Sequence, residues 1–225
     1  MNKLYFFLFL NSNLTKEQNI TVIHDINATN LSRMRLILII FILVEILFIL
    51  FNDIPYLTNP SSTVVWNDNK YFILHLLTVF VSFIGFILIK ILIKYDKKKP
   101  KLIHQSLIPA LTILILSFMA IIDGLDQAKL GHISSVFMAD LIIFSTVIML
   151  RFPLNLAVYL IPFLTYLGGL ITFQHNTETL ISNSINGFIF FLAIILVSTE
   201  IYNSHHEKIT KNMLLEELNF KLNYM

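Results

Sequence analysis

The side chains most able to do chemistry in this chain are ionisable groups that interrupt long apolar stretches. Glu45 lies near the middle of one such stretch, His75 about one helical turn into the next, and Asp140 about two turns into a later one. Placing an ionisable group at membrane depth costs about 2.5–3.5 kcal/mol on insertion scales, so each of these residues requires a physical reason. That reason is either a ligand or another side chain of the same protein.

Further polar residues gather at the same ends of the apolar stretches. Asp123 and Asp126 close one stretch, His132 opens the next, and Asn183 and Asn186 enter the last one. We predict a pocket on the outer side that takes a cationic, metallic or hydrogen-bonding ligand, formed by Glu45, His75, Asp123, Asp126, His132, Asp140 and Asn186. The alternative is that these side chains hydrogen-bond one another between helices, at about 0.6–1 kcal/mol per contact.

Catalytic and metal centres are not predicted. The chain has no cysteine, which excludes disulfides, thiol catalysis and cysteine-ligated metal. The histidines lack a spacing such as His-x-x-x-His, and only His75 lies within an apolar stretch, so neither a metal nor a haem is indicated. Gly-x-Ser-x-Gly, P-loop and His-Glu-x-x-His motifs are absent. We therefore expect no catalytic residue and no enzyme activity in this chain, and the sequence identifies no cofactor.

The composition indicates that a lipid bilayer is the main solvent of this protein. The chain has 225 residues, of which 56% are hydrophobic and 13% are charged, and its mean hydropathy is +0.75. A soluble domain is about a quarter charged, because charged groups cover its surface. We predict an all-α integral membrane protein with six helices of about the length that spans a bilayer, at 36–52, 70–95, 102–122, 133–150, 153–173 and 183–203.

Basic residues set the orientation of these helices. Apart from Lys70 and Lys129, all of the 16 Lys and Arg residues precede the first span, follow the sixth, or lie at the second-to-third and fourth-to-fifth connections. The positive-inside rule then places both termini in the cytoplasm, for a multi-pass protein of the inner (cytoplasmic) membrane. We expect a cytoplasmic segment at 1–34, in which Thr15 to Gln18 have the spacing of a helix-starting capping box. The transmembrane domain follows at 35–203 and a C-terminal helix at 204–225.

The C-terminal helix has the pattern of a dimer seam. Leu215, Leu218 and Leu222 are spaced in steps of three and four, as in a coiled coil, whereas Ile209 stands in a different register. We assign all four residues to the seam and expect the register to break between Ile209 and Leu215. A homodimer is therefore expected, with the lipid bilayer as the other partner and no nucleic acid.

Several short segments carry a resemblance to a known family. The chain contains Asp126-Gln127, Gly131-His132-Ile133, Arg151-Phe152-Pro153, Asn183 to Asn186 and Tyr202, and it closes on Leu214 to Asn223. The first group resembles the six-helix membrane region of bacterial diguanylate cyclases, and the last segment resembles the signalling helix before their GGDEF catalytic domain. The resemblance implies a sensory bundle whose C-terminal helix couples it to cyclase dimers that make cyclic di-GMP from two GTP.

The GGDEF motif and its GTP site are absent from the chain. The resemblance therefore implies the membrane sensor alone, with an output domain expected beyond Met225. A diguanylate cyclase is the output domain that the resemblance favours, and a histidine kinase is the alternative, since similar bundles precede kinases. A small six-helix transporter or channel is the other class that the sequence leaves open.

Overall fold

The computed structural model describes residues 14–58, 65–95, 102–130 and 136–224. These residues are almost entirely helical, and none of them forms a strand. The elements are α2 (Lys16–Phe48), the π-helix η1 (Ile49–Asp53), α3 (Ile54–Thr58), α4 (Val65–Tyr95), α5 (Leu102–Leu130), α6 (Val136–Val147), α7 (Phe152–Phe173) and α8 (Thr177–Asn223).

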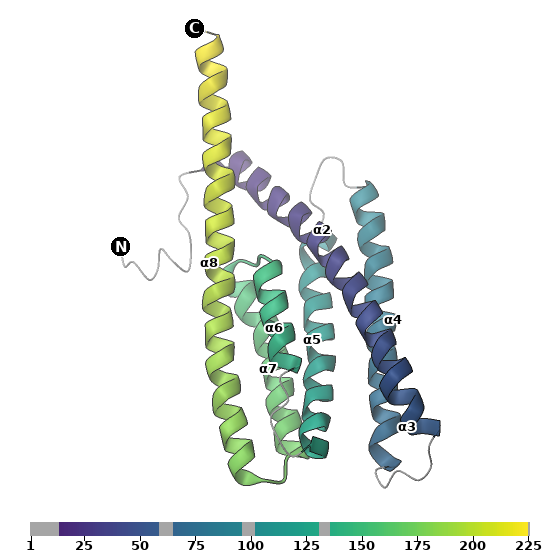
Figure 1. Ribbon diagram of the computed structural model, residues 1–225. Coiled ribbons are helices and arrows are strands. Elements are labelled where there is room, and N and C mark those ends of the chain that lie inside the picture. Colours follow the sequence, from purple (N-terminus) through teal and green to yellow (C-terminus); the bar gives the residue numbers. More distant parts are fainter. Residues whose placement is uncertain (1–13, 59–64, 96–101, 131–135, 225) are drawn as a thin grey trace.

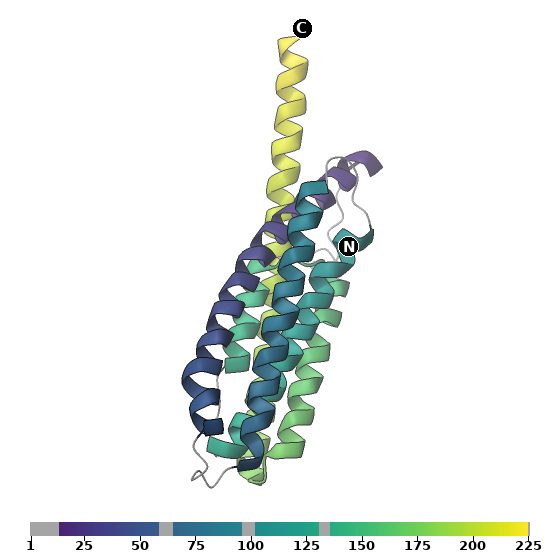
Figure 2. The ribbon, with the colours of Figure 1, turned by 90° about the vertical axis from the view of Figure 1, so that its right-hand side faces the viewer.

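The helices run roughly along one axis in a bundle (Figure 1). In this bundle α2 lies along α4, α5 lies along α7, and α8 packs on α6 and α7. The beginning of α2 and the end of α8 lie at the same end of the bundle, which we call the tail end. The other end we call the distal end. Viewed from the side, the last turns of α8 project well beyond every other helix (Figure 2).

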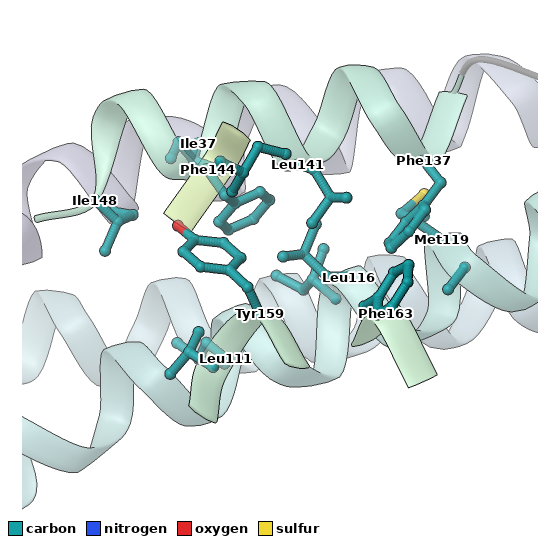
Figure 3. Packing of buried hydrophobic residues seen from close by; sticks show 14 of the residues in the cluster. Ile37, Leu111, Leu116, Met119, Phe137, Leu141, Phe144, Ile148, Tyr159 and Phe163 are labelled. Atoms are coloured by element: carbon teal, nitrogen blue, oxygen red, sulfur yellow. The ribbon is translucent and has the colours of Figure 1, made fainter. Parts of the chain in front are cut away.

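The core is apolar and so is much of the exterior. Figure 3 shows residues from α2, α5, α6 and α7 meeting in the interior, among them Ile37, Leu116, Phe144 and Tyr159, each no more than 4% exposed. Exposed Leu, Ile and Phe residues cover the outer faces of α2, α4 and α8. A soluble protein does not expose such continuous apolar surface. Among the described residues, five helices are long and apolar enough to cross a bilayer, as expected of a helical membrane protein.

The helix over the predicted fourth span ends earlier than expected. Its described part, α6, runs from Val136 to Val147, whereas the span was predicted to continue to residue 150. The backbone after Val147 is not helical. Instead, Asn30 of α2 pairs with the backbone of Met149, and Arg33 donates to the Val147 carbonyl oxygen at 3.0 Å. These contacts satisfy the Met149 N–H and the Val147 carbonyl oxygen, which a longer helix would have bonded internally, and the Met149 carbonyl oxygen, whose partner in a longer helix would be Pro153, a residue without an N–H.

The beginning of α2 matches its prediction. The Gln18 backbone N–H donates to the Thr15 hydroxyl at 3.3 Å, and the Thr15 N–H donates to the Gln18 side chain at 3.0 Å. This is the reciprocal capping box expected from the spacing. At the other end, helical structure continues through η1 and α3, beyond residue 52, where the first span was predicted to end.

Helices α5 and α7 approach closely where two glycines meet. A Cβ atom on Gly124 would lie 3.2 Å from the backbone of Gly169, whereas a Cβ atom on Gly168 would meet nothing within 4 Å. We expect Gly124→Leu to lower the free energy of unfolding by about 1–3 kcal/mol, the usual effect of overpacking. Gly168→Leu is the matched control and should change it by less than about 0.5 kcal/mol. Thermal unfolding in detergent would test this, and equal effects of the two variants would contradict the close packing.

Candidate functional site

A cavity of about 240 Å³ lies in the distal half of the bundle. It is bounded by α2, η1, α4, α5 and α6. Most of its wall is aliphatic or aromatic, and its polar lining consists of Glu45, Asn52, Tyr71, His75, Asp126 and Asp140. The structure thus brings four of the seven predicted site residues, Glu45, His75, Asp126 and Asp140, into one cavity. No Lys or Arg lines it among the described residues.

Glu45 and Asp140 are carboxyl groups that the protein leaves incompletely satisfied. Glu45 is 2% exposed and Asp140 is 9% exposed. The Glu45 Oε2 and Asp140 Oδ2 atoms are buried and have no hydrogen-bond partner among the described residues. An unsatisfied buried polar atom costs about 1–3 kcal/mol, and more when the group is charged. Interhelical hydrogen bonding, the alternative drawn from the sequence, therefore does not account for these two atoms.

His75 has a partner within the protein. Its Nδ1 atom lies 2.7 Å from Oδ2 of Asp53, and both side chains are buried. Asp53 reaches this position from η1, in which the helix is locally widened; π-helical turns of this kind occur often at functional sites. The ring of His75 also lies 5.5 Å from the ring of Phe48 and 6.2 Å from that of Tyr71, measured between centroids. The imidazole is thus fixed on one side of the cavity.

Asp123 belongs to a separate polar cluster at the distal end. Gln127 donates to Asp123 Oδ2 at 3.0 Å and to the Tyr166 hydroxyl at 3.4 Å, and Asn183 donates to Gln127 Oε1 at 2.5 Å. These contacts join α5, α7 and α8. Asp123 therefore hydrogen-bonds within α5 to Gln127, and Gln127 in turn links α5 to α7 and α8.

Of the two remaining predicted site residues, one lies away from the cavity and the other cannot be placed. Asn186 is exposed on α8, on a helix that does not line the cavity. His132 lies outside the described residues. Within the part of the chain that the structure describes, no group of three or more His, Asp or Glu side chains is placed to hold a metal ion.

Sequence reasoning missed Asp53 as the partner of His75. The predicted first span ended at residue 52, whereas helical structure continues through Asp53. The signal was the spacing of Phe41, Glu45, Phe48 and Asn52, which recur in steps of three and four, and all of which line the cavity. That periodicity indicates one helix face continuing past the expected end of the span.

At the tail end, α2 contacts α8. Val22 and Ile26 of α2 form a small buried cluster with Tyr202, and Ile209 and Met213 of α8 pack against it. Ile209 therefore lies on the face of α8 toward α2. At 100° per residue this face is roughly opposite the one that carries Leu215, Leu218 and Leu222. Ile209 does not belong with those three leucines, and this explains the change of register in the sequence.

Comparison with protein-family models, with curated proteins and with solved structures found no match to the chain.

Proposed function

We propose that the chain is the sensory and dimerisation module of a membrane signalling protein. It relays a signal from the outer side of the membrane, or from the membrane itself, to an output domain. A diguanylate cyclase is the output that the tail resembles. In this proposal the tail end lies in the cytoplasm, since Lys16, Arg33, Arg151 and Lys208 are placed there. The protein resides in the inner membrane and carries no catalytic residue of its own.

The observation that carries this proposal is the continuity of α8. It is one helix of 47 residues from Thr177 at the distal end to Asn223 beyond the bundle. Its projecting part is stabilised by ion pairs four residues apart, Lys211 with Glu207 and Lys221 with Glu217. An unbroken helix transmits a rotation or a slide over its whole length, so a rearrangement in the bundle reaches the tail.

Helix α2 supplies the link from the cavity to the tail. It carries Glu45 in the cavity and, about 40 Å away at 1.5 Å per residue, Gln18, which donates to Glu217 of α8 at 3.4 Å. A ligand shifts the equilibrium between two arrangements of the helices only if it binds one of them more tightly than the other. The coupling free energy is typically about 1–3 kcal/mol. Displacement of α2 by a bound ligand changes its packing on Tyr202, Ile209 and Met213, and with it the position of α8.

Cysteine crosslinking tests the dimer seam in a chain that has no cysteine of its own. Single cysteines at Leu215, Leu218 and Leu222 should crosslink between subunits in native membranes. Cysteines at Phe220 and Tyr224 are matched controls, because both residues are exposed on the opposite face of the same helix. They should crosslink much less. Equal crosslinking at all five positions, or none at any, would contradict the parallel dimer.

Fusion of a diguanylate cyclase domain after Met225 tests the relay itself. Insertion of two alanines between Met213 and Leu214 rotates the seam by about 200° relative to the bundle. Insertion of seven residues nearly restores its phase. We expect the two-residue insertion to change cyclic di-GMP production and the seven-residue insertion to preserve it. Production that is the same in all three forms would refute a relay through α8.

A further inference from the structure

We propose that the distal cavity binds an amphiphilic organic cation, such as an alkylammonium, which enters from the bilayer between α2 and α6. This inference rests on the proposed sensory role and names the chemical class of ligand that the module would detect.

The buried carboxyl groups of the cavity favour a cation. Glu45 and Asp140 line it, and no Lys or Arg lines it among the described residues. The one imidazole in its wall, that of His75, is hydrogen-bonded to Asp53. One oxygen of Glu45 and one of Asp140 are buried without a hydrogen-bond partner among the described residues. A cation bound beside these oxygens would stabilise their charged forms, which are costly in an apolar bundle without a nearby positive charge.

The rest of the wall favours an organic cation over a metal ion. Metal ions need several oxygen or nitrogen ligands converging at short distance, and no such group is present among the described residues. The wall instead contains Phe41, Phe48 and Tyr71, together with Met119 and Ile122. Aromatic faces attract ammonium groups, most strongly when water is excluded. Aliphatic side chains accept the alkyl part of the same molecule.

The cavity reaches the lipid-facing surface of the bundle. Ile40 and Val44 of α2 and Ile143 of α6 line it, yet they are 58%, 40% and 44% exposed. These residues stand on either side of the groove between α2 and α6, two helices that touch each other little. A ligand with an alkyl chain can therefore leave the bilayer through this groove with its ammonium group toward Glu45 and Asp140.

The test is equilibrium binding of radiolabelled octyltrimethylammonium to the full chain in nanodiscs, with empty nanodiscs as the blank. We expect saturable binding above the blank and no competition by 1-octanol, which has the same alkyl chain without the charge. Glu45→Gln and Asp140→Asn should each weaken binding about tenfold or more, which corresponds to roughly 1.4 kcal/mol. Glu200→Gln is the matched control. It removes an exposed carboxylate of α8 that does not line the cavity, and it should bind like the parent.

Each variant is checked for folding by its melting temperature, and if one fails to fold, the other carries the test. Binding equal to the blank, effective competition by 1-octanol, or unchanged affinity in both folded variants would overturn the proposed ligand class. The seam crosslinking described above is first measured without ligand, so the two proposals fail separately. It is then repeated with octyltrimethylammonium. Saturable binding without any change in the crosslinking pattern would keep the site and refute its sensory role. Absence of saturable binding with an intact seam pattern would refute the site alone.

Discussion

Replacing His75 with Leu is expected to lower the free energy of unfolding by about 3–5 kcal/mol, the usual cost of breaking a buried ion pair. Asp53 is 2% exposed, and its Oδ2 atom lies 2.7 Å from His75 Nδ1. In His75→Leu the carboxyl group stays buried at the same place and loses this partner. Unfolding in a mixed-micelle titration would measure the loss.

His24→Leu provides the matched control for this prediction. His24 also stands beside an aspartate, with its Nδ1 atom 3.7 Å from Oδ1 of Asp25, but these side chains are 33% and 52% exposed, against 6% and 2% for His75 and Asp53. An exposed pair contributes about 0–1 kcal/mol, so this variant should unfold almost like the parent. The double variant Asp53→Leu/His75→Leu should recover much of the stability lost in His75→Leu, because it removes the stranded carboxyl group. A His75→Leu variant as stable as His24→Leu would show that the pair does not hold η1 against α4.

Asn30→Ala is expected to lower the free energy of unfolding by about 2–4 kcal/mol, since each buried polar group left unsatisfied costs roughly 1–3 kcal/mol. Asn30 Nδ2 donates to the Met149 carbonyl oxygen at 2.7 Å, and its Oδ1 atom accepts from the Met149 N–H at 2.9 Å. The side chain thereby satisfies the Met149 N–H, which a longer α6 would have bonded internally, and the Met149 carbonyl oxygen, which would have faced Pro153, a residue without an N–H. The same variant, fused to a cyclase, should respond less to events in the cavity, because it loosens α2 from the tail end.

Asn27→Ala is the control for Asn30→Ala. Asn27 lies on the same helix about one turn away, and its Nδ2 atom is buried with no hydrogen-bond partner among the described residues. Its removal breaks no hydrogen bond that the structure shows, so it should not lower the stability. If both variants lose similar stability, the paired hydrogen bonds to Met149 are not what fastens α2 to the α6–α7 connection.

The two predictions concern two positions along the continuous segment formed by α2 and η1. Asp53 of η1 pairs with His75 beside the cavity, and Asn30 of α2 pairs with Met149 nearer the tail end. A change at either position therefore alters how α2 lies against its neighbours. Loss of the His75 pair should affect the cavity first, whereas loss of the Asn30 contact should affect the packing of Val22 and Ile26 on Tyr202. Measuring both variants in the fused cyclase separates detection from transmission.

Some elements of this fold were predictable because their signals are local. The capping box at Thr15 depends on residues three apart, and the start of α7 depends on Arg151 and Pro153, which stand where α6 has ended. The residue at which α6 ends could not be predicted from such local signals. Its apolar stretch continues to Leu150, and the helix stops at Val147 where Asn30, more than a hundred residues earlier, bonds to the following backbone.

The sequence by itself determined that the chain is a bundle of membrane helices with buried ionisable groups, because hydropathy and charge act along the chain one segment at a time. It also singled out Glu45, His75, Asp126 and Asp140. Only the tertiary structure decided that these four share a cavity, that Asp123 joins Gln127 instead, and that Asn186 faces outward. Which polar groups meet depends on the rotation of each helix about its axis and on its neighbours. Both are set by the packing of side chains far apart in the sequence, such as Ile37 against Phe144.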